Sequence, residues 1–432
     1  MTTGTPRLLL AAAGEPWEAH VLTLLAAPGT PAALARRCVD VPDVVAAAAA
    51  GQGTAAVVSV ELAGLDPDVV ARLRDTGIGV VAVASGATGS ARARGLGLDP
   101  VLDADAVSAD PAVVLAAVAR LAEASSHPPG ESQLPPAATE HPPDDADTGR
   151  VVAVWGPTGA PGRSTLGLGL AAAAADAGIQ TLLVDADVYG GATAQMLAVL
   201  DEVSGVLAAA RAASTGGLDD VALAEAARQV TPRLRVLTGL PRAERWTALR
   251  PAALRHVLAR ARRTARLVVV DCGFSIEQNE ELSFDTAAPR RNGATLTALA
   301  DADLVLVVGS ADPLGLARLA RARDELREAV PTAQVRLVVN RVRGGLGWSR
   351  DDVSRTLLRA IGEVPLGYLP LDQAAVDACW VNGRTLPEAA PQSALARGLA
   401  GLADAVALDL DISTGPAHSA GRGNRLRRRV RS

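Results

Sequence analysis

The sequence predicts an α/β protein made of two domains, each built on a mostly parallel β-sheet. With 432 residues, the chain is long enough for about two or three domains of ordinary size. Short apolar runs alternate with segments of helical periodicity on both sides of a proline-rich stretch at 123–150. Hydrophobic residues make up 49% of the chain but aromatic residues only 2%, so the cores must consist of Ala, Val and Leu.

The first domain is expected over residues 1–122. Buried strands are predicted at 7–13, 55–60 and 79–84, separated by helical patterns such as 41–50 and 66–75. Alternating strands and helices are typical of a parallel sheet covered by helices. In the stretch 123–150, prolines alternate with Ser, His and acidic residues, and the hydrophobic periodicity disappears. This composition predicts a stiff, disordered linker.

The second domain is expected over residues 151–413. Strand-like apolar runs recur at 151–155, 181–184, 267–270, 304–308 and 335–339, with helical patterns between them. Continuous apolar strands of this kind are buried on both faces, which predicts a doubly wound, mostly parallel sheet. Such sheets bind ligands at the carboxyl ends of their strands.

A glycine-rich turn lies between the strand at 151–155 and an apolar helical segment. Gly162 and Ser164 match the phosphate-binding pattern GxxxxGK[ST], whereas Pro157 replaces its first glycine and Arg163 replaces its lysine. The backbone N–H groups of such a turn and the positive end of the helix dipole attract an anion. The turn therefore predicts a phosphate site with an imperfect motif.

Three aspartates follow two other predicted strands. Asp185 and Asp187 come after the strand at 181–184, and Asp271 comes after the strand at 267–270. A single aspartate at the end of a strand is usually a turn or cap residue. Three of them beside a glycine loop instead predict carboxylates that reach Mg²⁺ or its water shell.

With these motifs, residues 151–408 resemble the MinD/ParA family of P-loop ATPases, whose phosphate loop reads Gly-Lys-Gly-Gly-x-Gly-Lys-Thr. Thr158 stands where that family has its signature lysine, and Arg163 stands where it has the second lysine. Asp185 and Asp187 match its DxD motif, and Asp271 matches its second acidic motif. Asn340 and Arg341 look like its adenine-recognition segment, and residues 367–395 look like its closing segment.

The resemblance implies a P-loop NTPase fold, ATP and Mg²⁺ as cofactors, and a set of site residues. Asp187 and Asp185 are implied as catalytic, and Ser164 and Asp271 as Mg²⁺ ligands. The nucleotide-binding residues are implied to be Gly159, Ala160, Gly162, Arg163, Ser164, Thr165, Asn340, Arg341 and Pro370. The sequence contains no lysine, so both loop lysines are absent and any ATP hydrolysis is expected to be slow or impaired.

The two-domain layout is similar to the CpaE/TadZ pilus-assembly proteins and to the actinobacterial septum-site-determining proteins. In that case the first domain is a degenerate, flavodoxin-like receiver, because Ser59, Val60 and Glu61 stand where the third strand of a receiver has its phosphoacceptor aspartate. The resemblance implies a nucleotide-linked homodimer that positions a division, pilus or secretion machine. It also implies division or secretion proteins as partners.

Two alternatives remain open at this point. One is a non-hydrolysing scaffold that kept the fold and lost the nucleotide. The other is a Rossmann-type, dinucleotide-dependent oxidoreductase, motivated by the spacing of Gly156, Gly159 and Gly162 and by Asp185 about 20 residues further on.

The remaining sequence features concern where in the cell the protein is expected. The three cysteines are far apart, so neither a disulfide framework nor a zinc site is indicated, and a cytoplasmic protein is expected. No apolar run reaches the ~18 residues that a membrane span needs. The net charge is −5, but the segment 414–432 is expected to be a disordered tail with six arginines between Arg422 and Arg431. These predict weak contact with an anionic membrane or DNA, and hence at most a peripheral position on the inner face of the membrane.

Overall fold

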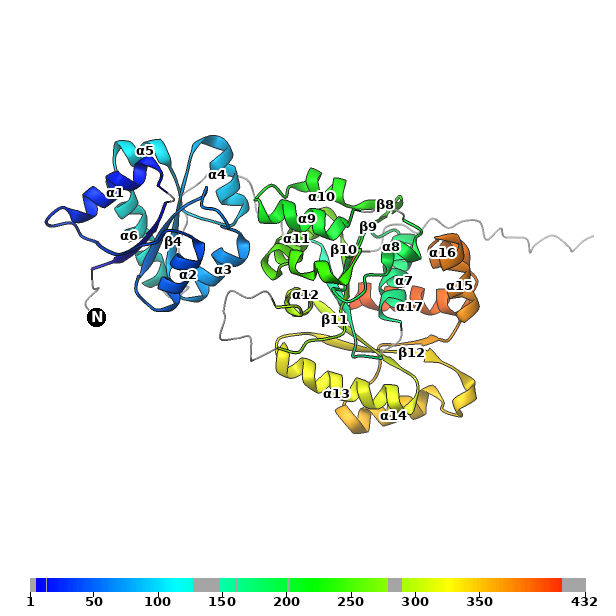
Figure 1. Cartoon of the computed structure of the whole chain (residues 1–432). Coiled ribbons are helices and arrows are strands. Elements are labelled where there is room, and N and C mark those ends of the chain that lie inside the picture. Colours follow the sequence, from blue (N-terminus) through cyan, green and yellow to red (C-terminus); the bar gives the residue numbers. More distant parts are fainter. Residues whose placement is uncertain are drawn as a thin grey trace, which may run out of the picture.

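The computed structural model describes residues 5–12, 14–126, 148–159, 162–199, 203–278 and 290–413. These residues form two α/β domains, drawn in blue to cyan and in green to red in Figure 1. Parts of the predicted linker (127–147) and the predicted tail (414–432) lie outside the described residues. Among the described residues, no helix is both long enough and apolar enough to cross a lipid bilayer.

The first domain contains a five-stranded parallel sheet with the order β2-β1-β3-β4-β5. Its strands are β1 (Arg7–Ala11), β2 (Ala33–Arg37), β3 (Ala55–Ser59), β4 (Gly79–Ala84) and β5 (Val101–Asp103). Its helices are α1 (Pro16–Ala26), α2 (Val41–Ala49), α3 (Pro67–Asp75), α4 (Gly86–Gly95), α5 (Ala104–Ala109) and α6 (Ala112–Ser126). This strand order is that of flavodoxin-like folds, as predicted.

Two strands of the first domain carry no sequence signal. β2 is exposed along its whole length because it lies at the sheet edge, so it lacks an apolar run. β5 has only three residues. By contrast, β3 and β4 are buried almost throughout and coincide closely with the predicted apolar runs.

The second domain contains an eight-stranded sheet with the order β13-β12-β11-β6-β10-β7-β9-β8. Its strands are β6 (Arg150–Trp155), β7 (Thr181–Ala186), β8 (Arg228–Thr231), β9 (Leu234–Leu237), β10 (Leu267–Cys272), β11 (Leu304–Ser310), β12 (Val335–Val342) and β13 (Gly367–Pro370). Among the described strands of this sheet, only the pair of β8 and β9 at one edge is antiparallel. The prediction of a mostly parallel sheet is therefore confirmed.

Helices cover both faces of this sheet. They are α7 (Arg163–Asp176), α8 (Thr193–Met196), α9 (Gly205–Ser214), α10 (Asp220–Ala226), α11 (Pro251–Thr264), α12 (Gly293–Asp301), α13 (Pro313–Ala329), α14 (Arg350–Ile361), α15 (Gln373–Asn382), α16 (Leu386–Ala389) and α17 (Ala394–Asp409), with 3₁₀ turns η1 (Ala243–Ala248) and η3 (Gly344–Leu346). On one face α7 and α15 to α17 pack against the strands. On the other, α9 and α11 to α14 do so.

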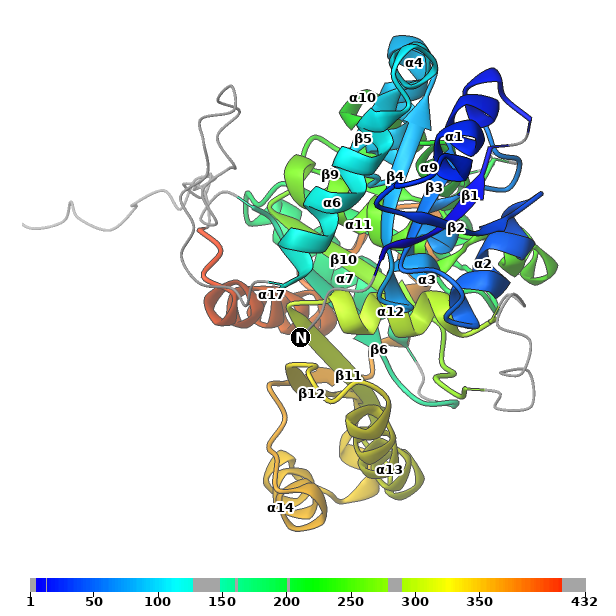
Figure 2. The ribbon, with the colours of Figure 1, turned by 90° about the vertical axis from the view of Figure 1, so that its left-hand side faces the viewer.

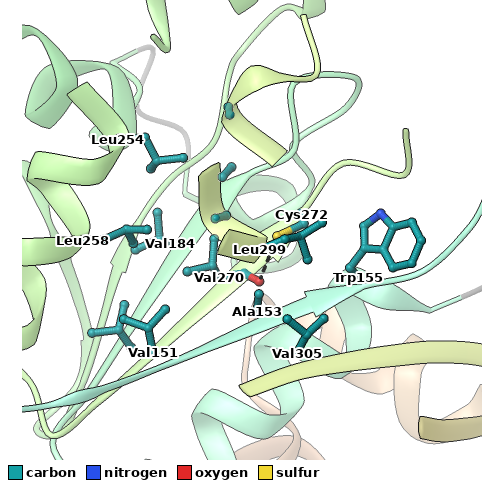
Figure 3. Close-up of a cluster of buried hydrophobic side chains, with 14 of the residues drawn as sticks. Val151, Ala153, Trp155, Val184, Leu254, Leu258, Val270, Cys272, Leu299 and Val305 are labelled. Atoms are coloured by element: carbon teal, nitrogen blue, oxygen red, sulfur yellow. Dashed lines mark hydrogen bonds between the residues drawn. The ribbon is translucent and has the colours of Figure 1, made fainter. Parts of the chain in front are cut away.

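The core beneath α11 and α12 consists of small and branched side chains. Figure 3 shows Val151, Val184 and Val270 from three neighbouring strands pointing toward Leu254 and Leu258 of α11. These side chains are almost completely buried. The low aromatic content is thus compensated by many closely packed aliphatic contacts.

The strand order excludes the Rossmann alternative. In a Rossmann dinucleotide-binding fold the strands before and after the glycine-rich loop and its helix are neighbours. Here β10 lies between β6 and β7, with parallel pairing on both sides. The acidic residue at the end of β7 therefore does not stand beside the strand that carries the loop, and the spacing of three glycines had suggested the wrong topology.

The two domains contact each other through α3 and α11. The backbone N–H of Ala252, at the start of α11, donates a hydrogen bond of 2.8 Å to Oδ1 of Asp68 in α3. Beside it, Arg250 forms an ion pair with Asp66. The helices α13 and α14 lie together at one end of the second domain, at the bottom of Figures 1 and 2.

Candidate functional site

The phosphate loop connects the central strand β6 to α7. Gly162 caps α7 with φ +98°, in the left-handed region that favours glycine. A Cβ at this position would overlap Nδ2 of Asn340, so the loop and the end of β12 approach each other closely. Gly159 also has a positive φ of +67°, whereas Ala160 lies outside the described residues. Ser164 and Thr165 belong to the first turn of α7, whose N–H groups face the loop.

Arg163 folds back over its own loop. Its Nη1 donates a hydrogen bond of 3.0 Å to the carbonyl oxygen of Gly156, and its Nη2 lies 3.8 Å from Oδ2 of Asp187. The guanidinium carbon lies 5.8 Å from the centre of the Phe274 ring. Its Nε is buried without a hydrogen-bond partner within the described residues. The positive charge of this arginine is therefore kept at the loop, where the MinD/ParA pattern has a lysine.

Asp271 ends β10 beneath α7 and is only 1% exposed. Neither of its carboxylate oxygens has a hydrogen-bond partner of good geometry in the described part of the chain. Burial, and then repulsion by Asp185, raise its pKa well above the usual value, while the nearby Ser164 hydroxyl lowers it in part. A buried carboxylate without a partner is an unsatisfied acceptor, which a hydrated cation would satisfy.

Ser164 and Asp271 can hold Mg²⁺, as predicted, only if a nucleotide supplies further ligands. The described residues contain no group of three His, Cys, Asp or Glu side chains placed to hold a metal ion. The hydroxyl of Ser164 and the unpartnered carboxylate of Asp271 therefore suffice only if nucleotide phosphates complete the coordination, as is usual for Mg²⁺.

Asp185 is held by the backbone around it. Its two oxygens accept hydrogen bonds from the N–H groups of Asp187, at 3.3 Å, and Thr193, at 3.1 Å. A Cβ at Gly239 would come within 2.5 Å of its Cγ, so the end of β9 also packs against it. Burial raises the pKa of Asp185 to about 6. These contacts join the end of β7 to the start of α8.

Asp187 lies between the loop and a hydrogen-bonded network that the sequence analysis missed. Its Oδ1 accepts a hydrogen bond of 2.8 Å from the N–H of Tyr189, and its Oδ2 faces Arg163. The hydroxyl of Tyr189 donates to Oδ1 of Asn292 at 2.6 Å, and Nδ2 of Asn292 donates to Ser275 at 3.0 Å. The only signal for this network was the position of Tyr189 two residues after Asp187.

A second part of the site lies at the other end of the loop. Gly162, Thr165, Asn340, Arg341 and Pro370 line one cavity of about 70 Å³, together with Gln373, Trp380 and other side chains from α15 and α17. The structure therefore brings together five of the predicted nucleotide-binding residues. The cavity is smaller than the roughly 300–1,000 Å³ typical of ligand sites, so a base can enter only if lining side chains move.

In the first domain, the third strand ends at Ser59. Ser59 is fully buried there, and its hydroxyl donates a hydrogen bond of 2.5 Å to Oε1 of Glu15. Oε2 of Glu15 accepts a hydrogen bond of 2.6 Å from the indole N–H of Trp17. Each of the two carboxylate oxygens of Glu15 thus accepts a hydrogen bond.

Comparisons with protein-family models and with curated protein sequences give no match. Among solved structures, a ParA family ATPase from Chlorobium tepidum TLS is similar, with a TM-score of 0.50 and 18% identity over 59% of this chain and 98% of that chain. The cell division ATPase MinD from Pyrococcus furiosus is 21% identical over 60% of this chain and 98% of that chain, with a TM-score of 0.46. At such identities the likeness concerns the fold, and the second domain of this chain has the α/β fold of the ParA-type P-loop ATPases.

Proposed function

We propose that the second domain binds ATP with Mg²⁺ and acts as a nucleotide-dependent positioning protein with slow hydrolysis. The observation that carries this proposal is the unpartnered, buried carboxylate of Asp271 beside Ser164 at the N-terminus of α7. A glycine loop, a hydroxyl at the start of a helix and a strand-end aspartate form the set that P-loop ATPases use for a Mg²⁺-bound nucleotide.

The proposed binding mode divides the site into two parts. The N–H groups of the loop and of the first turn of α7 bind the phosphates, and the cavity lined by Asn340, Arg341 and Pro370 takes the base. Mg²⁺, when bound, would supply positive charge beside the phosphates. Ser164 and Asp271 are the residues that would hold it, Ser164 through its hydroxyl and Asp271 by accepting hydrogen bonds from the water shell of the ion.

Slow hydrolysis follows from the loop residues. Asp187 is the carboxylate available to orient an attacking water, but its Oδ2 faces Arg163. Thr158 provides no charge where the signature lysine of the MinD/ParA pattern would stand. Because a positive charge at the transferring phosphate is worth about 10³–10⁵ in rate, its loss reduces turnover far more than binding.

We further propose that nucleotide binding changes self-association, and that the resulting homodimer helps to place a division, pilus or secretion machine. The first domain then serves as an adaptor and not as a phosphorylated receiver, since a serine held by Glu15 occupies the phosphoacceptor position. The tail at Arg422–Arg431 adds a weak electrostatic contact with an anionic surface.

Two observations favour the alternative of a nucleotide-free scaffold. Arg163 is already bonded to Gly156 and paired with Asp187, and the base cavity is narrow. In this alternative the arginine replaces the ligand and holds the loop closed.

Calorimetry with the full-length chain separates the two. Mg²⁺–ATP should bind, and Ser164→Ala and Asp271→Ala should each weaken binding about tenfold or more, as expected when one ligand or one charged hydrogen-bond acceptor is removed. Ser90→Ala is a matched control, because its hydroxyl bonds only to a helix carbonyl of α4. Absence of binding to the unmodified chain would reject ATP binding and leave the scaffold.

A further inference from the structure

The helix α13 places an arginine directly on the phosphate loop. α13 follows β11, which pairs with β6, and Arg318 lies in its second turn. A Cβ at Gly159 would collide with Nη1 of Arg318, so the guanidinium packs against the backbone of this glycine. Nothing in the sequence around Arg318 indicates this contact, since the residue lies more than 150 residues after the loop in a helix with many arginines.

The guanidinium of Arg318 differs in its contacts from those of Arg323, on the same helix, and Arg163, in the loop. Within the described residues the side chain of Arg318 forms no hydrogen bond or ion pair, although the residue is half-buried. On the same helix, Arg323 donates a hydrogen bond of 2.7 Å to Glu363. In the loop itself, Arg163 is paired with Asp187. A half-buried guanidinium without a partner retains its full ability to bind an anion.

A cavity of about 340 Å³ lies next to this arginine. It is lined by Arg318 and Arg321 of α13, by Pro157 and Thr158 of the loop, and by Phe274 among other residues. Glu277 and Glu325 also line it, but within the described residues neither forms an ion pair with Arg318. No ion pair with Arg318 therefore fills this cavity within the described residues, and the cavity borders Thr158, which stands where the MinD/ParA pattern has its signature lysine.

The positions of the two cavities indicate the orientation in which a nucleotide would lie along the loop. The base cavity is bordered by Gly162 and Thr165, at the end of the loop that enters α7. The second cavity is bordered by Pro157 and Thr158, at the opposite end of the loop. If the base occupies the first cavity, the phosphates run along the loop toward Gly159, and the terminal phosphate is the one closest to Arg318.

We propose that Arg318 is a specificity-determining residue that binds the terminal phosphate of a nucleoside triphosphate from within the same chain. It would supply the positive charge that Thr158 lacks, and it would let the protein distinguish a triphosphate from a diphosphate. A planar guanidinium suits this task, because it donates two parallel hydrogen bonds to phosphate oxygens. This inference rests on the proposed function, since it requires nucleotide at the loop.

The test measures binding and needs no hydrolysis. Full-length protein is titrated by calorimetry with Mg²⁺–AMPPNP, a non-hydrolysable triphosphate analogue, and with Mg²⁺–ADP. Arg318→Gln should weaken binding of the analogue about tenfold, the factor expected for one charge-assisted hydrogen bond, and should leave ADP within about twofold. Arg327→Gln is the matched control. It removes the same charge from an exposed position of the same helix that does not line the cavity, and both nucleotides should stay within about twofold.

The outcomes separate this inference from the proposed function. If the unmodified chain binds both nucleotides but Arg318→Gln changes neither, or weakens both equally, the inference is wrong and ATP binding stands. If the unmodified chain binds neither nucleotide, ATP binding and the role of Arg318 both fail. Thermal unfolding of each variant excludes loss of the fold as the cause of weaker binding.

Discussion

Nη2 of Arg163 lies 3.8 Å from Oδ2 of Asp187, across the phosphate loop. The two groups are the loop cation and the carboxylate that we propose to orient the attacking water, and both are largely buried. Each therefore stabilises the other where a bound triphosphate would need them free. The arginine that stands in place of a loop lysine is therefore paired with the carboxylate that we propose as catalytic.

Replacing both loop positions should raise ATP turnover. Thr158→Lys together with Arg163→Lys restores the two lysines of the MinD/ParA pattern, and exposed Thr158 leaves room for the longer side chain. We expect at least a tenfold increase in phosphate release, measured in a coupled assay. Adding Asp187→Ala to the double variant should remove the gain. An unchanged rate in the double variant would show that the defect lies elsewhere, for example in dimerisation.

A side chain at Gly162 should damage the site. Gly162→Ala introduces a Cβ that overlaps Nδ2 of Asn340 at a residue with φ +98°. Such strain costs roughly 1–3 kcal/mol, so the free energy of unfolding should fall by that amount and nucleotide binding should weaken. Gly190→Ala is the control, because no atom lies within 4 Å of its added Cβ and its φ is not positive. Equal stability of the two variants in urea titrations would contradict the loop geometry.

The contact between the domains should depend on Asp68. Asp68→Ala leaves the N–H of Ala252 without its acceptor, which costs about 1 kcal/mol and should increase the radius of gyration in small-angle scattering. Asp351→Ala, on the exposed side of α14, is the control. A radius of gyration unchanged by Asp68→Ala would mean that this hydrogen bond does not hold the domains together.

The stability of the protein should depend on pH through the carboxyl group of Asp68. Burial raises the pKa of Asp68 above its usual value, so the folded state keeps this proton to higher pH than the unfolded state. Its contribution to stability is complete below the unfolded pKa of about 3.9 and is lost as the pH rises through the folded pKa. Asp68→Asn keeps an acceptor oxygen and carries no charge, so its gain in melting temperature over the unmodified chain should be larger at pH 7 than at pH 4. A pH-independent difference would contradict the raised pKa.

The arginine-rich segment at Arg422–Arg431 should bind anionic vesicles weakly. Each arginine near such a surface contributes about 1 kcal/mol, and this attraction is screened as the Debye length falls from about 10 Å at 0.1 M salt to about 3 Å at 1 M. Co-sedimentation of the full chain should therefore decrease steeply with salt, whereas a chain truncated after residue 421 should not sediment. Salt-resistant sedimentation, or equal sedimentation of both proteins, would show that the two domains, and not the arginine-rich segment, bind the vesicles.

The sequence by itself determined the fold class and most of the central strands. Apolar runs such as 267–270 and 304–308 are buried on both faces, and burial of this kind leaves a continuous hydrophobic signal. Local chemistry also identified the loop, since the left-handed conformation at Gly162 and the first turn of α7 follow from adjacent residues. Edge elements such as β2 left no such signal, because one side of each faces water.

The tertiary structure decided which residues meet at the site. The order of the strands, with β10 between β6 and β7, depends on long-range packing and placed Asp271 beneath α7. The same packing brought Asn292 to Tyr189 and Arg318 to Gly159. Contacts between residues more than 100 positions apart arise only when sheet and helices pack together, so periodicity and local motifs contain no trace of them.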